Sequence, residues 1–153
     1  KTAYEIRLSL VGSEMCKETD GASTIDDLVT AGKYGWKNSD INDCNFPQDR
    51  TGDEQVEIEL VHLDRDISID GALAELDRRG LRPANPAELL AFGASFPEVQ
   101  RDFPVIALGQ VWRDPFGLRS VVCLGRDGSK RGAVLYWTVD DWARLCRFAG
   151  LRK

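Results

Sequence analysis

The pair Asp127-Gly128 lies between two β-rich runs and constrains the fold of this chain more than any other short feature. Asp-Gly flanked by such runs is a strong signal for a tight hairpin turn, so residues 119–124 and 133–139 are predicted to be neighbouring antiparallel strands. A third β-rich run, residues 105–108, precedes another turn sequence at residues 114–117. The last third of the chain is therefore predicted to be a series of short strands.

Two earlier segments alternate apolar and polar residues, as half-buried strands do. Residues 3–11 and 55–63 each place an apolar side chain at nearly every second position. Because successive side chains of a strand point to opposite faces, each segment is expected to bury one face and expose the other. The residues expected to share one face are Tyr4, Ile6, Leu8 and Leu10 in the first segment and Val56, Ile58, Leu60 and His62 in the second.

Helix signals separate these strands, and the strongest is the run Asn85-Pro86-Ala87-Glu88. It has Asn at the cap, Pro at the first helical position and Glu at the third, which is the pattern of a capping box. Its helix is expected to bury Leu89, Leu90 and Phe92. Weaker signals predict three more helical segments: a short helix from Ser23-Thr24-Ile25-Asp26 to Gly32, a helix from Ser68 to Arg79 that stops at Gly80, and one turn at residues 97–101.

The order of these elements predicts one α+β domain that spans residues 1–153, with two to three helices packed on a largely antiparallel sheet. A chain of 153 residues is the usual size of one domain and buries enough surface to fold without a metal or a disulfide. The long loop 33–53 is expected to be held down by Trp36, Ile41 and Phe46.

The four cysteines, at positions 16, 44, 123 and 146, form no C-x-x-C pair. That spacing argues against a zinc knuckle or a thioredoxin-type motif. Cys123 and Cys146 lie in apolar runs, so the cysteines are expected to be buried free thiols, which favours a cytoplasmic location. No apolar run reaches the roughly 18 residues of a membrane-spanning helix. Lys1 in place of Met indicates a trimmed chain, so a removed signal peptide remains an alternative.

Charge is distributed unevenly along the chain. Residues 1–70 carry 7 Lys and Arg against 16 Asp and Glu, whereas residues 71–153 carry 13 against 9. One interpretation is that the two halves neutralise each other within the fold; the other is that the basic half binds an anionic partner. Aromatic side chains accompany the basic residues and are favoured anchors at interfaces. The candidate binding residues are Trp112, Arg113, Arg119, Arg126, Lys130, Arg131 and Trp137.

Catalytic and metal-binding patterns are weak. His62 is the only histidine, so any nucleophilic triad would need it, but its phase with the apolar positions indicates a structural residue. Residues 66–77 resemble part of a calcium loop, although Ile69 occupies a position that is normally polar, and a strand-to-helix turn capped by Ser68 explains the segment better. The carboxylates Glu54, Glu57, Glu59, Asp140 and Asp141 leave a carboxylate-dependent hydrolase as an alternative.

Several motifs in the second half resemble the C-type-lectin-like fold: Gly80-Leu81-Arg82-Pro83 followed by Glu88-Leu89, strands that carry Trp112 and Trp137, and the ending Trp142…Arg147-Phe148. In that family a terminal strand pairs with the N-terminal one, so the resemblance implies that residues 4–11 pair with residues 144–152. The calcium-binding Trp-Asn-Asp triplet of the family is absent, and sugar binding through calcium is not implied. The segment from Glu88 to Val105 is also similar to small bacterial proteins without an assigned function.

The sequence thus favours a non-enzymatic binding domain without a cofactor or metal. Its expected partner is another protein with an acidic surface, reached through the basic C-terminal residues. A nucleic-acid-binding module is an alternative, although the net charge of −5 argues against it. No membrane partner is expected.

Overall fold

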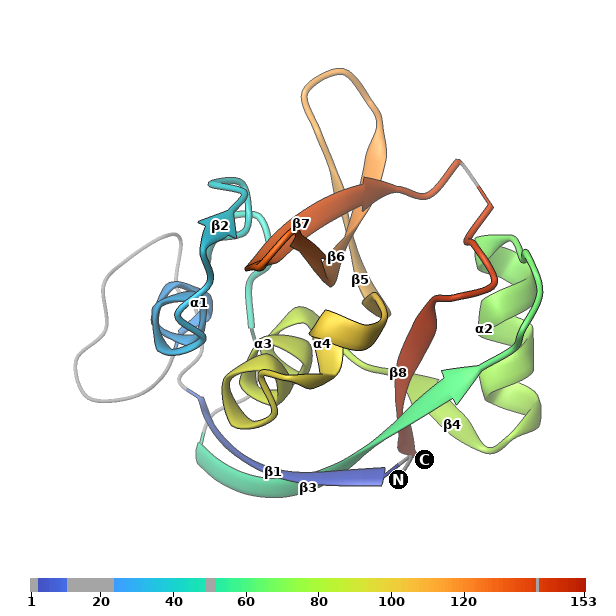
Figure 1. The fold of residues 1–153 in the computed structure, drawn as a ribbon, viewed down its shortest axis with the longest axis horizontal. Helices are drawn as coiled ribbons and strands as arrows, with labels where there is room; N and C mark the ends of the chain where they lie inside the picture. The colour runs from blue at the N-terminus through green and yellow to red at the C-terminus, as the bar shows by residue number, and fades with distance from the viewer. Residues whose placement is uncertain (1–2, 11–23, 49–51, 140) are drawn as a thin grey trace.

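The fold is one mixed sheet with helices on both faces (Figure 1). The computed structural model describes residues 3–10, 24–48, 52–139 and 141–153. The strand order is β1 (Ala3–Leu10), β3 (Gly52–His62), β8 (Arg147–Arg152), β5 (Val105–Arg113), β6 (Arg119–Asp127), β7 (Lys130–Trp137) and β2 (Trp36–Lys37), while β4 (Leu81–Pro83) pairs with β8. All neighbours are antiparallel except β5–β8 and β2–β7. The predicted single α+β domain with a largely antiparallel sheet is confirmed.

The sheet separates two hydrophobic cores. Helices α1 (Ile25–Ala31), α3 (Pro86–Ser95) and α4 (Val99–Asp102) lie on one face, and α2 (Ile69–Arg78) covers the other (Figure 1). Strand β6 shows the division, because Val122 and Leu124 enter the core under α1 and α3, whereas Val121 and Cys123 enter the core under α2. Alternating side chains of one strand therefore serve both layers.

The helix ends follow the sequence signals. Asn85 caps α3, and Glu88 returns a hydrogen bond to the Asn85 backbone. Ser68 caps α2, as the strand-to-helix interpretation of residues 66–77 expected. The capping box at the start of α1 lies one residue later than predicted. Thr24 is the N-cap residue, and Asp27 is the third helical residue, whose side chain accepts from the Thr24 backbone. Ser23, the expected cap, lies outside the described residues.

The predicted hairpin is present, but its two-residue loop is shifted by one residue. The Asp-Gly signal indicates a loop of Asp127 and Gly128. Asp127 and Lys130 form the closing pair, so the two loop residues are Gly128 and Ser129. Only Gly128 has a positive φ there, at 61°, which is the pattern of a type II′ turn.

The expected pairing of the N-terminal strand with the C-terminal strand is wrong. β3 lies between them and pairs with β1 on one side and β8 on the other. β3 is long enough to do both, because residues Gly52–Glu59 pair with β1 and residues Glu59–His62 pair with β8. The loop 33–53 also contains a strand that the sequence did not indicate, β2, while Ile41 and Phe46 are buried as predicted.

The cysteines divide into two groups. Cys123 and Cys146 are buried free thiols, as predicted, and burial raises the pKa of both. Cys44 is disulfide-bonded, so the expectation of a free thiol is wrong there. A disulfide persists in oxidising surroundings, and Cys44 therefore gives no support to a cytoplasmic location. Among the described helices, none is long and apolar enough to cross a membrane.

Candidate functional site

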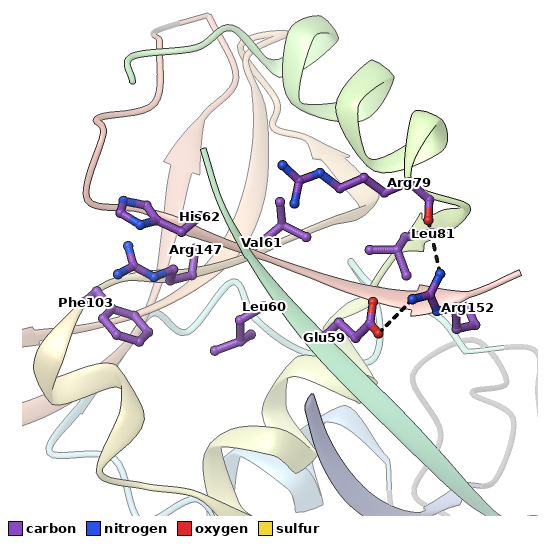
Figure 2. A pocket seen from close by; sticks show the side chains of 9 residues that line it. All are labelled: Glu59, Leu60, Val61, His62, Arg79, Leu81, Phe103, Arg147 and Arg152. Carbon is purple, nitrogen blue, oxygen red and sulfur yellow. Dashed lines mark hydrogen bonds and ion pairs between the residues drawn. The ribbon is translucent and has the colours of Figure 1, made fainter. Parts of the chain in front are cut away.

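A cleft rich in arginine lies where β3 and β8 meet the end of α2 (Figure 2). Its volume is about 610 Å³. We name it the arginine cleft, and its lining residues are Glu59, Leu60, Val61, His62, Arg79, Leu81, Phe103, Arg147 and Arg152. They come from four separate stretches of the chain, so the cleft is a product of the tertiary fold.

One end of the arginine cleft is built around Arg147. Antiparallel pairing of β3 with β8 places His62 directly opposite Arg147, and residues opposite each other share a face of the sheet. The Arg147 guanidinium lies over the Phe103 ring, 4.0 Å from the ring centroid, in a cation–π contact. Its Nη1 donates to the Leu145 carbonyl at 2.9 Å. The stack on Phe103 and this bond hold the guanidinium in place, with its remaining donors unused by the described residues.

His62 lines the same end of the cleft. Its Nε2 lies 2.8 Å from the carbonyl oxygen of Arg144. A carbonyl only accepts, so Nε2 carries the proton of this bond; the same nitrogen lies 3.8 Å from Asp64 Oδ1. His62 is thus held by a backbone contact on a strand, in agreement with its predicted structural role.

The other end contains Arg79 and Arg152. Arg152 donates to Glu59 Oε1 and to the backbone carbonyl of Arg79, both at 3.2 Å, and these bonds are drawn in Figure 2. Arg79 donates through Nε to Glu75 at 3.1 Å. Glu75 also binds Arg78, and the two arginines lower the pKa of Glu75 to about 2, so one carboxylate serves two cations at neutral pH. The terminal nitrogens of Arg79 have no other partner in the described parts of the chain.

The arrangement suits an anion. Three guanidinium groups and one carboxylate line the arginine cleft, and arginine binds carboxylate or phosphate through two parallel hydrogen bonds. Leu60 adds apolar lining from the core under α3, and Val61 and Leu81 add it from the core under α2. Apolar surroundings lower the local dielectric, which strengthens such bonds. The cleft therefore offers guanidinium groups that can bind an anion.

The candidate binding residues predicted from the sequence lie elsewhere and do not form one site. Arg126 and Lys130 are exposed at the β6–β7 hairpin, and Arg113 and Arg119 form an exposed cross-strand pair at the far ends of β5 and β6. Like charges directly opposite each other destabilise a sheet slightly. Trp137 is 54% exposed and Trp112 is half-buried beside it on the α1 face, where both line a shallow cavity.

Arg131 is different, because it is buried and holds the fold together. It is 7% exposed and donates to the Gly32 carbonyl at 2.7 Å, the Gly93 carbonyl at 2.7 Å and Gln100 Oε1 at 3.0 Å. Gly32 ends α1 and Gly93 lies in the last turn of α3, so the cation meets the negative ends of two helices. We therefore exclude Arg131 from any binding surface.

The carboxylates proposed for hydrolysis do not converge. Glu59 is paired with Arg152, and strand alternation places Glu57 and Glu59 on the face opposite Glu54. Asp140 lies outside the described residues. No group of three potential metal ligands occurs in the part of the chain that the structure describes.

The candidate binding residues predicted from the sequence include none of the arginines that line the arginine cleft. Arg147 and Arg152 belong to the basic C-terminal segment, where nine basic residues meet four acidic ones over residues 103–153. Arg79 was interpreted as a helix end, and Phe103 carried no signal at all. A comparison with known proteins adds no assignment: no protein-family model, no curated protein and no solved structure matches this chain. The resemblance to the C-type-lectin-like fold remains a prediction.

Proposed function

We propose that the domain is a non-enzymatic binding module that holds an acidic segment of a partner protein in the arginine cleft. The observation that carries the proposal is Arg147, which is fixed on Phe103 with unused donors and has no carboxylate of the described residues within 4.0 Å. A guanidinium held in this way is pre-organised for a ligand carboxylate, because little side-chain entropy is lost on binding. Arg79 provides a second incompletely used guanidinium.

An acidic peptide fits the charge of the molecule better than a nucleic acid does. The chain has a net charge of −5, and this overall charge repels a long polyanion, whose binding depends on many phosphate contacts. A short acidic segment needs only the local positive charge of the arginine cleft. Carboxylates also match the two-pronged geometry of arginine.

The test compares two arginines that carry the same charge and differ in location. The probe is an amide-capped hexaglutamate peptide, with a twelve-residue thymidine oligonucleotide as the nucleic-acid alternative. Arg147→Ala is expected to weaken peptide binding about tenfold or more, as loss of a charge-assisted pair does. Arg126→Ala, the matched control on the exposed hairpin, is expected to change the Kd less than about twofold because exposed charges are strongly screened.

A third variant separates charge from geometry. Arg147→Lys keeps the cation and loses the planar fork that stacks on Phe103, so its affinity should lie between those of the wild type and Arg147→Ala. Equal loss in Arg126→Ala and Arg147→Ala would move the site to the hairpin. If the protein bound the oligonucleotide more tightly than the peptide, the proposed acidic protein partner would be wrong and a nucleic acid would be the better candidate.

A further inference from the structure

Two glycines face each other in the middle of the β6–β7 ladder and lack an obvious reason within the fold. Gly125 pairs directly with Gly132. Glycine inside a strand costs about 0.5–1 kcal/mol relative to alanine, and such a position often marks the close approach of a backbone or a ligand. Two of them in register require an explanation.

A clash requires neither glycine, and the space beside Gly125 is the more open of the two. A Cβ at Gly132 would lie 3.5 Å from Val134 Cγ1 and 3.8 Å from the Trp36 ring, so the position is already in contact with other groups. A Cβ at Gly125 would meet nothing within 4 Å. Packing therefore leaves room for a side chain at Gly125, and the chain keeps that space open.

The open space belongs to a trough of about 430 Å³ on the α2 side of the sheet, beyond the part that α2 covers. We name it the glycine trough; its lining residues are Gly35, Trp36, Gly125, Arg126, Asp127, Lys130, Gly132, Val134 and Tyr136. Trp36 and Tyr136 are 54% and 44% exposed, unusually high for large aromatic side chains. A flat floor of backbone between exposed aromatic rings fits a planar ring, which stacks on such side chains with about 1–3 kcal/mol per ring.

One end of the glycine trough is cationic. Lys130, Gly132, Val134 and Tyr136 follow each other at every second position of β7 and so share one face. A step of two residues spans about 7 Å, which separates Lys130 from the glycine floor. Gly35 lies against the stem of Lys130, since a Cβ there would approach Lys130 Cβ to 3.1 Å. No described carboxylate lies within 4.0 Å of the Lys130 ammonium.

We propose that the glycine trough binds a nucleotide. The planar base lies on the floor of Gly125 and Gly132 beside Trp36, and the phosphate is bound by Lys130. The Lys130 backbone lies one two-residue step from the floor, and its long side chain gives the ammonium the reach to meet the phosphate of a nucleoside monophosphate whose base lies on that floor. The glycine trough shares no residue with the arginine cleft, so this inference is independent of the proposed function.

Gly125→Val is the decisive variant, because its side chain enters the open space, where an added Cβ meets nothing within 4 Å. The strand conformation of Gly125 lacks a positive φ, and a β-branched residue in a strand is expected to leave stability unchanged or raise it by about 0.4–1 kcal/mol. The four nucleoside monophosphates, adenosine and inorganic phosphate are the probes, followed by quenching of tryptophan fluorescence and by calorimetry. At least one monophosphate is expected to bind saturably, and Gly125→Val to weaken it tenfold or more at an unchanged or higher Tm.

Two further variants complete the test. Lys130→Ala is expected to weaken the monophosphate and leave adenosine unaffected, because only the phosphate contacts the ammonium. Phe116→Ala, the control, removes an aromatic side chain that is 90% exposed at a different turn and should leave binding unchanged. Failure of all four monophosphates to bind at millimolar concentration would overturn the proposal. Wild-type affinity in Gly125→Val would also overturn it.

Discussion

Replacing Arg131 with alanine is expected to lower the free energy of unfolding by about 3–5 kcal/mol, the largest effect of any single substitution that we predict. The change leaves three buried acceptors without a donor: the carbonyls of Gly32 and Gly93 and the amide oxygen of Gln100. It also removes the cation that meets the ends of α1 and α3 and lies over the Tyr34 ring. Arg131→Lys should recover little of the loss, because one ammonium does not span three acceptors.

Urea unfolding followed by circular dichroism measures this effect. Arg126→Ala is the matched control, since Arg126 lies directly opposite Arg131 in the β6–β7 ladder and is exposed. Its free energy of unfolding should change by less than about 0.5 kcal/mol. Similar losses in the two variants would mean that Arg131 does not act as the described helix-end cation.

The second large effect is expected at Glu88. Its side chain is fully buried and binds Arg82 through two bonds of 2.9 and 2.7 Å, while Oε1 also accepts from the Asn85 backbone. Glu88→Ala should therefore cost about 2–4 kcal/mol, because it leaves the Arg82 charge half-buried and breaks the capping box of α3. Glu88→Gln keeps one acceptor and should cost less.

Thermal unfolding of both variants, with Glu98→Ala beside them, checks this prediction. Glu98 pairs with Arg101 at 3.1 Å on the surface, where its side chain is 80% exposed, and such pairs contribute about 0–1 kcal/mol. Tm should fall in the order Glu98→Ala, Glu88→Gln, Glu88→Ala, with the last lowest. If Glu98→Ala lowered Tm as much as Glu88→Ala, the burial of Glu88 would not explain the loss of stability.

Local signals in the sequence predicted most of the elements of the fold. The caps at Ser68 and Asn85, the stop at Gly80 and the alternation in residues 55–63 all depend on contacts within a few residues. Such contacts are determined by short segments and are readable without knowledge of the rest of the molecule. The types of the elements and the α+β class could therefore be predicted from the sequence.

The pairing of strands that are distant in the sequence could not be predicted in the same way. β2 has two residues and pairs in parallel with β7, so neither its length nor its pattern distinguishes it from a loop. The sequence also gave no way to decide that β3 lies between β1 and β8, because alternation shows which face is buried and not which strand is adjacent.

The candidate site shows the same limit. Charge counting directed attention to exposed arginines in turns, such as Arg126, and misassigned Arg131, whose burial depends on helix ends far away in sequence. The arginine cleft combines Arg79 with Arg147, and only tertiary structure brings their segments together. A basic segment predicts an anionic partner more readily than it predicts which of its cations bind.

The most direct measurement of the central claim is an NMR titration of the labelled protein with the hexaglutamate peptide, observed at the arginine Nε–H signals. Assignment follows from the Arg147→Lys and Arg79→Lys variants. The account predicts saturable shifts of the Arg147 and Arg79 signals, with those of Arg113 and Arg126 unchanged. Shifts confined to Arg113, Arg119 or Arg126, with Arg147 unmoved at saturation, would contradict it.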